Sequence, residues 1–455
     1  MASKSSNKHL LTQGNIPTQL LYLAFPTIIG MLGMVVFNLT DTFFLGRLGP
    51  NQLTALSFTF PVIMVVQSFA HGIGMGSSVL TARAFGAQNN RLLKRITTDS
   101  LVLGFIITLI TSSIGLLTIE PLFTALGAEG EILSYIKDYM SIWYLGVIMV
   151  VIPMIGNHTI RAIGDTKTPG LIMALSASIN IILDPLLIFG IGPFPRLEVK
   201  GAAIATVFAR SITALVAIYV LRKREGLISF KNTRIKEIID SWKQIIYIGL
   251  PNSLTRMAPP LVQGVIVRLL AGFGPYAVAG FGIGTRIEIF ALSPIMALSS
   301  VFGPFMGQNL GAKKYGRMKS ADQISKQYSF IAGFSSAAIL FLAAPTVAKI
   351  FSKNTEIINS AVLYMRIVPI SYGLWGIFQL GTVFLNVMKK PFIAAGWTMT
   401  QFFILVLPFA FLGAHLAGEK GILIALSISY ILSGLLIRQY VKNLIPQPTF
   451  SDKAE

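Results

Sequence analysis

The sequence predicts an all-α integral membrane protein with about twelve transmembrane helices, arranged as two six-helix bundles that are related by a parallel internal repeat. Three observations lead to this prediction: long apolar runs, a segment that occurs twice, and a one-sided distribution of Lys and Arg. Of the 455 residues, 53% are hydrophobic and 12% are charged, whereas about 25% of the residues in an ordinary soluble domain are charged.

The apolar runs follow one another along the whole chain, six in each half. About 20 apolar residues cross a roughly 30 Å hydrocarbon core as a helix, and a helix is required because backbone polar groups cannot stay unpaired in lipid. The alternating pattern of a transmembrane barrel is absent. The runs that we interpret as helices cover residues 18–45, 53–80, 98–120, 133–156, 168–191, 201–221, 243–271, 276–304, 327–351, 359–386, 392–416 and 421–441.

A repeat divides the chain into two halves. The segment QLLYLAFP, which ends at Pro26, recurs 225 positions later as QIIYIGLP, which ends at Pro251. At the same offset, FGAQNNR from Phe85 recurs as LGAKKYG from Leu310. Two homologous halves in a membrane favour a transporter, because halves that pivot give alternating access to a site between them.

The net charge of +19 comes from 37 Lys and Arg against 18 Asp and Glu. Most of the basic residues lie at the two termini and in the loops after the even-numbered helices, which places these parts in the cytoplasm. Each half then begins and ends on the same side, as a parallel repeat requires. A nucleic-acid surface would interleave aromatic residues with the basic ones, and segments such as KRITTDS lack them.

We expect three parts: an N-lobe (residues 1–221), a cytoplasmic interlobe linker (222–242) and a C-lobe (243–455). The basic linker also fits an amphipathic segment on an anionic membrane surface. The chain has no Cys, its four His form no ligand pair at helical spacing, and it lacks P-loop, GxSxG and HExxH motifs. We therefore expect no enzyme, no metal and no cofactor, and transport that draws on a gradient of H⁺ or Na⁺.

Ionisable residues within a span are costly and are functional candidates by default. Asp41 shares a helix face with Asn38, and Asp184 shares one with Asn180. Pro185 follows Asp184, and we expect it to bend the helix and free a carbonyl. A carboxyl among apolar neighbours favours its protonated form, and the same oxygens could hold Na⁺. A structural hydrogen bond to a neighbouring helix is the alternative for both acids.

The second half keeps a proline at the equivalent place, Leu407-Pro408, but not the acid. This asymmetry predicts coupling in the N-lobe alone. Glu288, two residues from Arg286, fits either a secondary coupling role or a structural ion pair with Arg256 or Arg210. The substrate-pocket candidates are mostly flexible methionines, which adapt to varied apolar ligands but more commonly fill space: Met31, Met34, Met64, Met173 and Met257, together with Phe37 and Asn38.

Taken in order, AFPTIIGML, FNLTDTFFLGRLG, GIGMGSSVLTARAFGA, GNHTIRAIGDTKTP, INIILDPLLIFGIG, KGAAIATVFAR, GLPNSL and GPFMGQNLGAKKYGR resemble the multidrug and toxic compound extrusion (MATE) family over nearly the whole chain. The Asp41 and Asn180/Asp184 pattern is similar to the DinF-like branch of that family. The resemblance implies a polar N-lobe cluster at Asp41, Asn157, Asn180, Asp184 and Thr206. The branch often has a tyrosine one turn before the first-helix Asp, and here that position is Phe37.

The resemblance implies efflux of cationic or amphipathic organic compounds in exchange for H⁺ or Na⁺, by a monomer in a prokaryotic cytoplasmic membrane. The alternative is a flippase for a lipid-linked substrate on the same scaffold. Two or more of Arg210, Arg256 and Arg286 in the central cavity would favour the flippase. A membrane-embedded enzyme would need paired His or a Ser/Lys dyad within the spans, and we find neither.

Overall fold

The computed structural model describes residues 10–231, 234–442 and 444, apart from the side chain of Asn38. All regular elements in these residues are helices, which confirms the all-α prediction. The described chain divides into two compact units. Of the described residues, the first unit holds Leu10 and residues 26–253, and the second holds residues 11–25 together with those from Leu254 onward.

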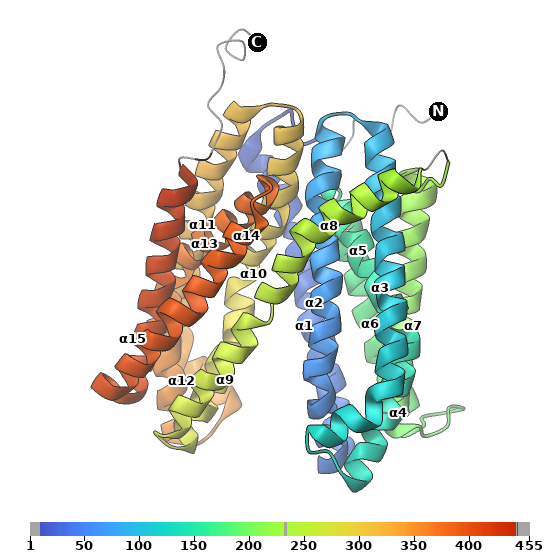
Figure 1. The fold of residues 1–455 in the computed structure, drawn as a ribbon. Coiled ribbons are helices and arrows are strands. Elements are labelled where there is room, and N and C mark those ends of the chain that lie inside the picture. The colour runs from blue at the N-terminus through green and yellow to red at the C-terminus, as the bar shows by residue number, and fades with distance from the viewer. Residues whose placement is uncertain (1–9, 232–233, 443, 445–455) are drawn as a thin grey trace. The chain divides into compact units, whose positions relative to one another are not determined.

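The first unit is a bundle of long helices (Figure 1). α2 packs against α3 and α5, and α7 packs against α4, α5 and α6. Its elements are α1 (Ile16–Leu48) from Pro26 onward, α2 (Pro50–Gly86), α3 (Asn90–Ala125), α4 (Gly130–Gly146), α5 (Ile148–Ala162), α6 (Lys167–Phe189), α7 (Glu198–Tyr219), the π-helical η2 (Val220–Arg224) and α8 (Ile235–Thr255) as far as Ser253.

The second unit is built in a similar way. Its α10 packs against α11 and α12, and its α13 packs against α11 and α15. The elements are the start of α1, the end of α8, α9 (Ala258–Ala271), α10 (Pro275–Gly311), α11 (Tyr315–Phe351), α12 (Thr355–Ile367), the 3₁₀ turn η3 (Val368–Ser371), α13 (Tyr372–Val387), α14 (Pro391–Met399), the π-helical η4 (Thr400–Val406) and α15 (Leu407–Lys442).

Nine helical segments of the described chain are long and apolar enough to cross a membrane, or ten if the α4–α5 pair, bent by 48°, forms one span. About twelve were predicted, and two features account for the difference. The seventh predicted span is broken between α8 and α9. The eleventh and twelfth run on as one segment of 52 residues, but Ala417 and Gly418 are non-helical and separate them close to the predicted boundary.

The repeat is also visible in the backbone geometry. Gln88 and Lys313, which lie 225 positions apart, both adopt the left-handed conformation just before α3 and α11. Gly164 and Lys389 form a second such pair before α6 and α14. Residues with a side chain rarely adopt this conformation, so its recurrence at the sequence offset shows that the two halves share their turn structures.

Glycines allow α2 and α8 to approach closely. A Cβ on Gly72 would collide with the Gly249 carbonyl and the Ser253 hydroxyl, and a Cβ on Gly76 would collide with the Ile245 carbonyl. A Cβ on Gly249 would lie 2.7 Å from the Gly72 carbonyl oxygen. The GIGMGSS segment is therefore a helix-packing motif, as small residues at such spacing indicate in membranes.

The turn before α6 is held by a buried carboxylate. Asp165 accepts hydrogen bonds from the Thr168 N–H at 3.0 Å and from the Thr168 hydroxyl at 2.5 Å, and it pairs with Arg224. Burial opposes ionisation of Asp165, but these bonds outweigh that effect and lower its pKa. The GDTKTP segment therefore anchors the start of α6 to the end of η2.

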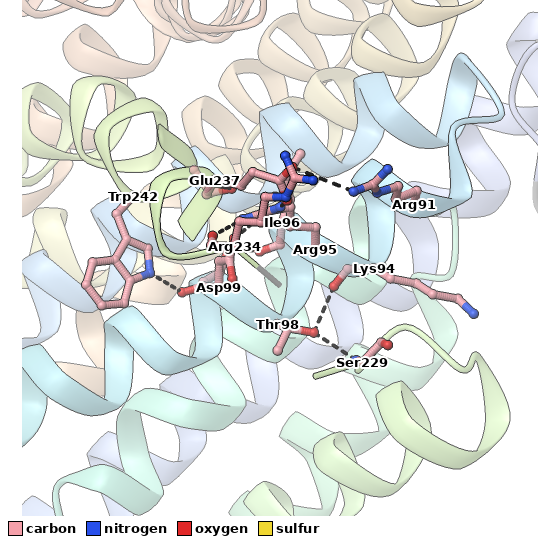
Figure 2. Close-up of polar contacts among 12 residues, drawn as sticks. Arg91, Lys94, Arg95, Ile96, Thr98, Asp99, Ser229, Arg234, Glu237 and Trp242 are labelled. Atoms are coloured by element: carbon pink, nitrogen blue, oxygen red, sulfur yellow. Dashed lines mark hydrogen bonds and ion pairs between the residues drawn. The ribbon is translucent and has the colours of Figure 1, made fainter. Parts of the chain in front are cut away.

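The predicted linker is anchored to α3 within the first unit (Figure 2). Arg95 lies between two carboxylates: it donates to Asp99 at 3.2 Å and pairs with Glu237. On either side, the Trp242 indole N–H donates to the Asp99 carbonyl at 3.0 Å, and the Ser229 N–H donates to the Thr98 hydroxyl at 2.9 Å. The hydrogen bond from Arg95 lowers the pKa of Glu237, which keeps this carboxylate ionised at neutral pH.

Replacing Arg95 with Ala should release the segment that precedes α8. The change leaves Asp99 and Glu237 without their shared cation, and losing one partner of a half-buried hydrogen-bonded network costs about 1–3 kcal/mol. We expect limited trypsin digestion between Arg222 and Lys236 to become several times faster. Lys94→Ala is the matched control, because it also removes one basic residue but its exposed side chain makes none of these contacts. Equal digestion rates in the two variants would contradict the anchoring role.

Candidate cation-coupling site

The two acidic residues predicted in the N-lobe lie in one bundle. Asp41 is about two turns before the end of α1, and Asp184 is just over one turn before the end of α6. Asp184 and Asn180 are both 0% exposed, and the Asn180 side-chain NH₂ donates to Asp184 Oδ1 at 2.9 Å. The Asp41 carboxylate is close enough to Asp184 for their charges to interact. The structure thus brings Asp41, Asn180 and Asp184 together.

Several oxygens in this bundle are buried without a hydrogen-bond partner among the described residues. They are Asp41 Oδ1, Asp184 Oδ2, Asn180 Oδ1, Asn157 Oδ1 and Thr206 Oγ1. Buried polar atoms are nearly always hydrogen-bonded, so a group of unsatisfied acceptors indicates a place for a proton or a cation. Neither carboxylate forms an ion pair within the described part of the chain.

Asn157 and Thr206 are placed less closely. Each is 8% exposed, on α5 and α7 respectively, and the described structure records no contact between these side chains and the two carboxylates. α5 and α7 both pack against α6. These residues therefore share the bundle with Asp184, and their part in the cluster remains a prediction from the family pattern.

Tyr139 of α4 is a member of the cluster that the sequence analysis missed. It is 4% exposed and lies within electrostatic range of both Asp41 and Asp184. The sequence has Phe37 where the family branch often has a tyrosine, which suggested that no hydroxyl accompanies the carboxylates. A tyrosine hydroxyl is present, but it comes from another helix, and only the packing of α4 against the bundle reveals it.

Pro185 does not interrupt α6, which is one helix from Lys167 to Phe189. The bend expected from the sequence therefore does not end the helix at this residue. In the second half, Pro408 is the second residue after the π-helical η4, which ends at Val406. A π-helical turn is another way to accommodate a residue that has no N–H to donate.

Arg210 of α7 projects into the same bundle. Its guanidinium lies 4.9 Å from the centre of the Phe37 ring, and its Nη2 lies 3.5 Å from Met34 Sδ. Its Nε is buried and has no hydrogen-bond partner among the described residues. A cation–π contact contributes about 0.5–2 kcal/mol, whereas the effective penalty for burying an unpaired charge is several kcal/mol. The contact with Phe37 therefore does not offset the burial of this charge.

The methionine candidates belong to two different units, and their role in a substrate pocket stays a prediction. Met31, Met34, Met64 and Met173 are partly buried in the first unit, but Met257 belongs to the second. Phe37 is 5% exposed, and its ring contacts the Arg210 guanidinium. Asn38 lies in α1, but its side chain is outside the described residues.

Glu288 of α10 occupies a separate site in the second unit. It accepts a hydrogen bond from the Tyr364 hydroxyl at 2.8 Å, and its charge also reaches Tyr372 and Tyr430. Glu288 forms no ion pair with Arg256, which lies in the same unit, among the described residues. Its pairing with Arg210, which belongs to the first unit, stays a prediction. Arg286 is exposed, and Arg256 lies at the break between α8 and α9.

Two histidines that looked scattered in the sequence meet in the fold. The rings of His71 on α2 and His158 on α5 are 5.1 Å apart, edge to face. No group of three or more His, Cys, Asp or Glu in the searched residues could hold a metal ion. The pairing follows from the contact between α2 and α5, which helical spacing along one segment cannot indicate.

Comparisons with known proteins agree with the two-fold repeat. The MatE family model matches residues 26–186 and again residues 251–412, so its two copies start 225 positions apart. A curated protein called the FAD transporter of Shewanella oneidensis is 38% identical over 451 residues, covering 99% of both chains. The multidrug export protein MepA of Staphylococcus haemolyticus is 28% identical over 438 residues, covering 95% of this chain and 94% of its own.

Solved structures share the whole fold. The bent form of the Vibrio cholerae MATE transporter VcmN superimposes with a TM-score of 0.88 at 28% identity, covering 98% of this chain and 100% of that one. A MOP superfamily transporter from Pyrococcus furiosus gives a TM-score of 0.88 at 24% identity, covering 98% of each chain. The predicted fold of two six-helix bundles is thereby confirmed.

Proposed function

This chain belongs to the MATE family, and on that premise we propose that it exports a flavin nucleotide, FAD or a close relative, in exchange for protons. The family consists of multi-span membrane transporters, not enzymes, and the chain is an efflux transporter of the bacterial cytoplasmic membrane. The flavin cargo is supported by the FAD transporter relative, which is 38% identical along 99% of both chains.

Proton coupling is supported by the pair of carboxylates in the first unit. Asp41 and Asp184 have buried oxygens with no partner in the described structure, and their like charges interact. A proton needs a single oxygen acceptor, whereas Na⁺ needs several converging ones. The Asn180 side chain turns its NH₂, not its oxygen, toward Asp184 Oδ1, so at this carboxylate oxygen it offers a hydrogen-bond donor and not a second cation ligand. This arrangement favours H⁺ over Na⁺.

In the proposed cycle, protons reach the two carboxylates from outside and remove their mutual repulsion, which changes the position of α1. Phe37 and Met34 lie on α1, about one and two turns before Asp41, so the same movement alters the surface beside Arg210. Charge alone would not expel an anionic cargo when the acids become neutral. Exchange of protons for the cargo therefore requires that protonation act through the movement of α1. The protons and the cargo must each bind one of the two conformations of the transporter more tightly than the other.

Cationic or amphipathic drugs are the second candidate cargo. The carboxylates would attract a cation, and the multidrug export protein MepA is 28% identical over 95% of this chain. The flippase is less well supported. Of the three arginines that would favour it, Arg286 is exposed, Arg256 lies at the α8–α9 break, and Arg210 alone projects into the first bundle.

Transport into everted membrane vesicles tests the proposal. We expect FAD uptake when the vesicle lumen is acidic, and no uptake when a Na⁺ gradient is imposed at equal pH inside and outside. Asp184→Asn vesicles serve as the background. Uptake of FAD driven by Na⁺ alone would overturn proton coupling. Uptake of ethidium but not of FAD under the acid gradient would overturn the flavin cargo and favour the drug exporter.

A further inference from the structure

The described structure shows no role for Arg210, an unpaired arginine of the first bundle, in stabilising the fold. Three other arginines of the described chain have polar partners: Arg95 binds Asp99 and Glu237, Arg224 binds Asp165, and Arg317 binds backbone carbonyls near Gly14. Among the described residues, the polar and cation–π contacts of Arg210 are with the Phe37 ring and the Met34 sulfur, and its Nε is unsatisfied. An unsatisfied guanidinium is prepared to bind an anion.

We propose that Arg210 is the specificity-determining residue of the transporter, and that it binds a phosphate group of the cargo while the Phe37 ring packs against the guanidinium. This inference rests on the proposed function and deepens it. Arginine presents a planar fork of donors that matches two phosphate oxygens, and it stacks on aromatic rings at the same time. The Nε–H of Arg210 has no acceptor among the described residues, so this donor has no competing protein partner when a ligand oxygen binds.

The position of Arg210 separates cargo recognition from proton binding. Phe37 lies one turn before Asp41 on α1, so the guanidinium over Phe37 is displaced along the bundle from the carboxylate pair. Arg210 forms no ion pair with Asp41 or Asp184 in the described structure. An anion can therefore bind at Arg210 while the carboxylates remain the proton site, and α1 connects the two through Phe37 and Asp41.

The proposal predicts a preference that follows phosphate content. FAD has two phosphates, FMN has one and riboflavin has none, and all three share the same tricyclic ring. The test measures binding of each flavin to the purified full-length protein by fluorescence quenching, with the wild type, Arg210→Gln and Arg210→Lys. Arg47→Gln is the matched control, because Arg47 also lies over a phenylalanine of α1, 4.6 Å from the Phe43 ring, but at an exposed position.

We expect wild-type affinity in the order FAD, FMN, riboflavin. Arg210→Gln should weaken FAD binding at least tenfold, or about 1.4 kcal/mol, and riboflavin binding less than twofold. Arg210→Lys keeps the charge without the fork and should give an intermediate loss for FAD. If the Arg210→Gln variant does not fold, the Arg210→Lys variant alone tests the proposal. Riboflavin binding reports that the site is intact, and Arg47→Gln should behave as the wild type.

The outcomes separate this inference from the proposed function. If the wild type binds FAD and both Arg210 variants keep its preference for FAD over riboflavin, the phosphate role is wrong and flavin export stands. If the wild type binds ethidium but none of the three flavins, the proposed cargo itself is wrong. Loss of FAD and riboflavin binding to the same extent in Arg210→Lys would assign Arg210 a structural role instead.

Discussion

Asp184→Asn is expected to abolish coupled transport while leaving the folded protein in the membrane. Asp184 is fully buried, its Oδ1 accepts the Asn180 NH₂, and its Oδ2 has no partner among the described residues. An amide has nearly the same shape as a carboxyl but cannot take up or release a proton. FAD uptake in everted vesicles should fall at least tenfold, equal to about 1.4 kcal/mol.

The control for this prediction is Glu120→Gln. It also neutralises one acid, but Glu120 belongs to an exposed ion pair with Lys137, at 2.9 Å, and exposed pairs contribute about 0–1 kcal/mol. Transport by this variant should equal that of the wild type. Expression and thermal unfolding in detergent should be the same for both variants. Wild-type transport by a well-expressed Asp184→Asn protein would exclude this acid from the coupling mechanism.

The fold could be predicted because each of its determinants is local or periodic. Apolar runs indicate spans, and the match of Pro26 with Pro251 indicates two copies of one unit. Two boundaries could not be predicted in this way. The break between α8 and α9 lies inside one apolar run, and the turn at Ala417–Gly418 is so tight that two helices follow each other without a loop. Hydropathy averages over both features.

The candidate site was only partly predictable. Asp41 and Asp184 are rare charges in apolar spans, so the sequence marks them directly. Tyr139 cannot be found this way, because a tyrosine in an apolar helix is common and only the packing of α4 brings it to the carboxylates. The contact between His71 and His158 and the stacking of Arg210 on Phe37 are likewise pairings between helices, which no spacing along one helix encodes.

Gly170→Val is expected to inactivate the transporter through the packing of α1. A Cβ on Gly170 of α6 would lie 2.6 Å from the Pro26 carbonyl oxygen, and a Cβ on Gly30 of α1 would lie 3.1 Å from the Gly170 Cα. The two helices thus touch backbone to backbone beside Pro26, where α1 has no N–H to donate and its hydrogen-bond ladder is weakest. A valine there must push α1 away from α6.

We expect this displacement to separate Asp41 from Asp184, because the first is carried by α1 and the second by α6. Overpacking of this kind costs about 1–3 kcal/mol, so the unfolding temperature in detergent should fall and FAD uptake should drop to the Asp184→Asn background. Gly282→Val is the matched control: it places the same side chain within a helix, α10, where a Cβ would meet no atom within 4 Å. If the Gly170 and Gly282 variants transport equally well, the α1–α6 contact does not hold the carboxylates in register, and coupling through the movement of α1 loses its structural basis.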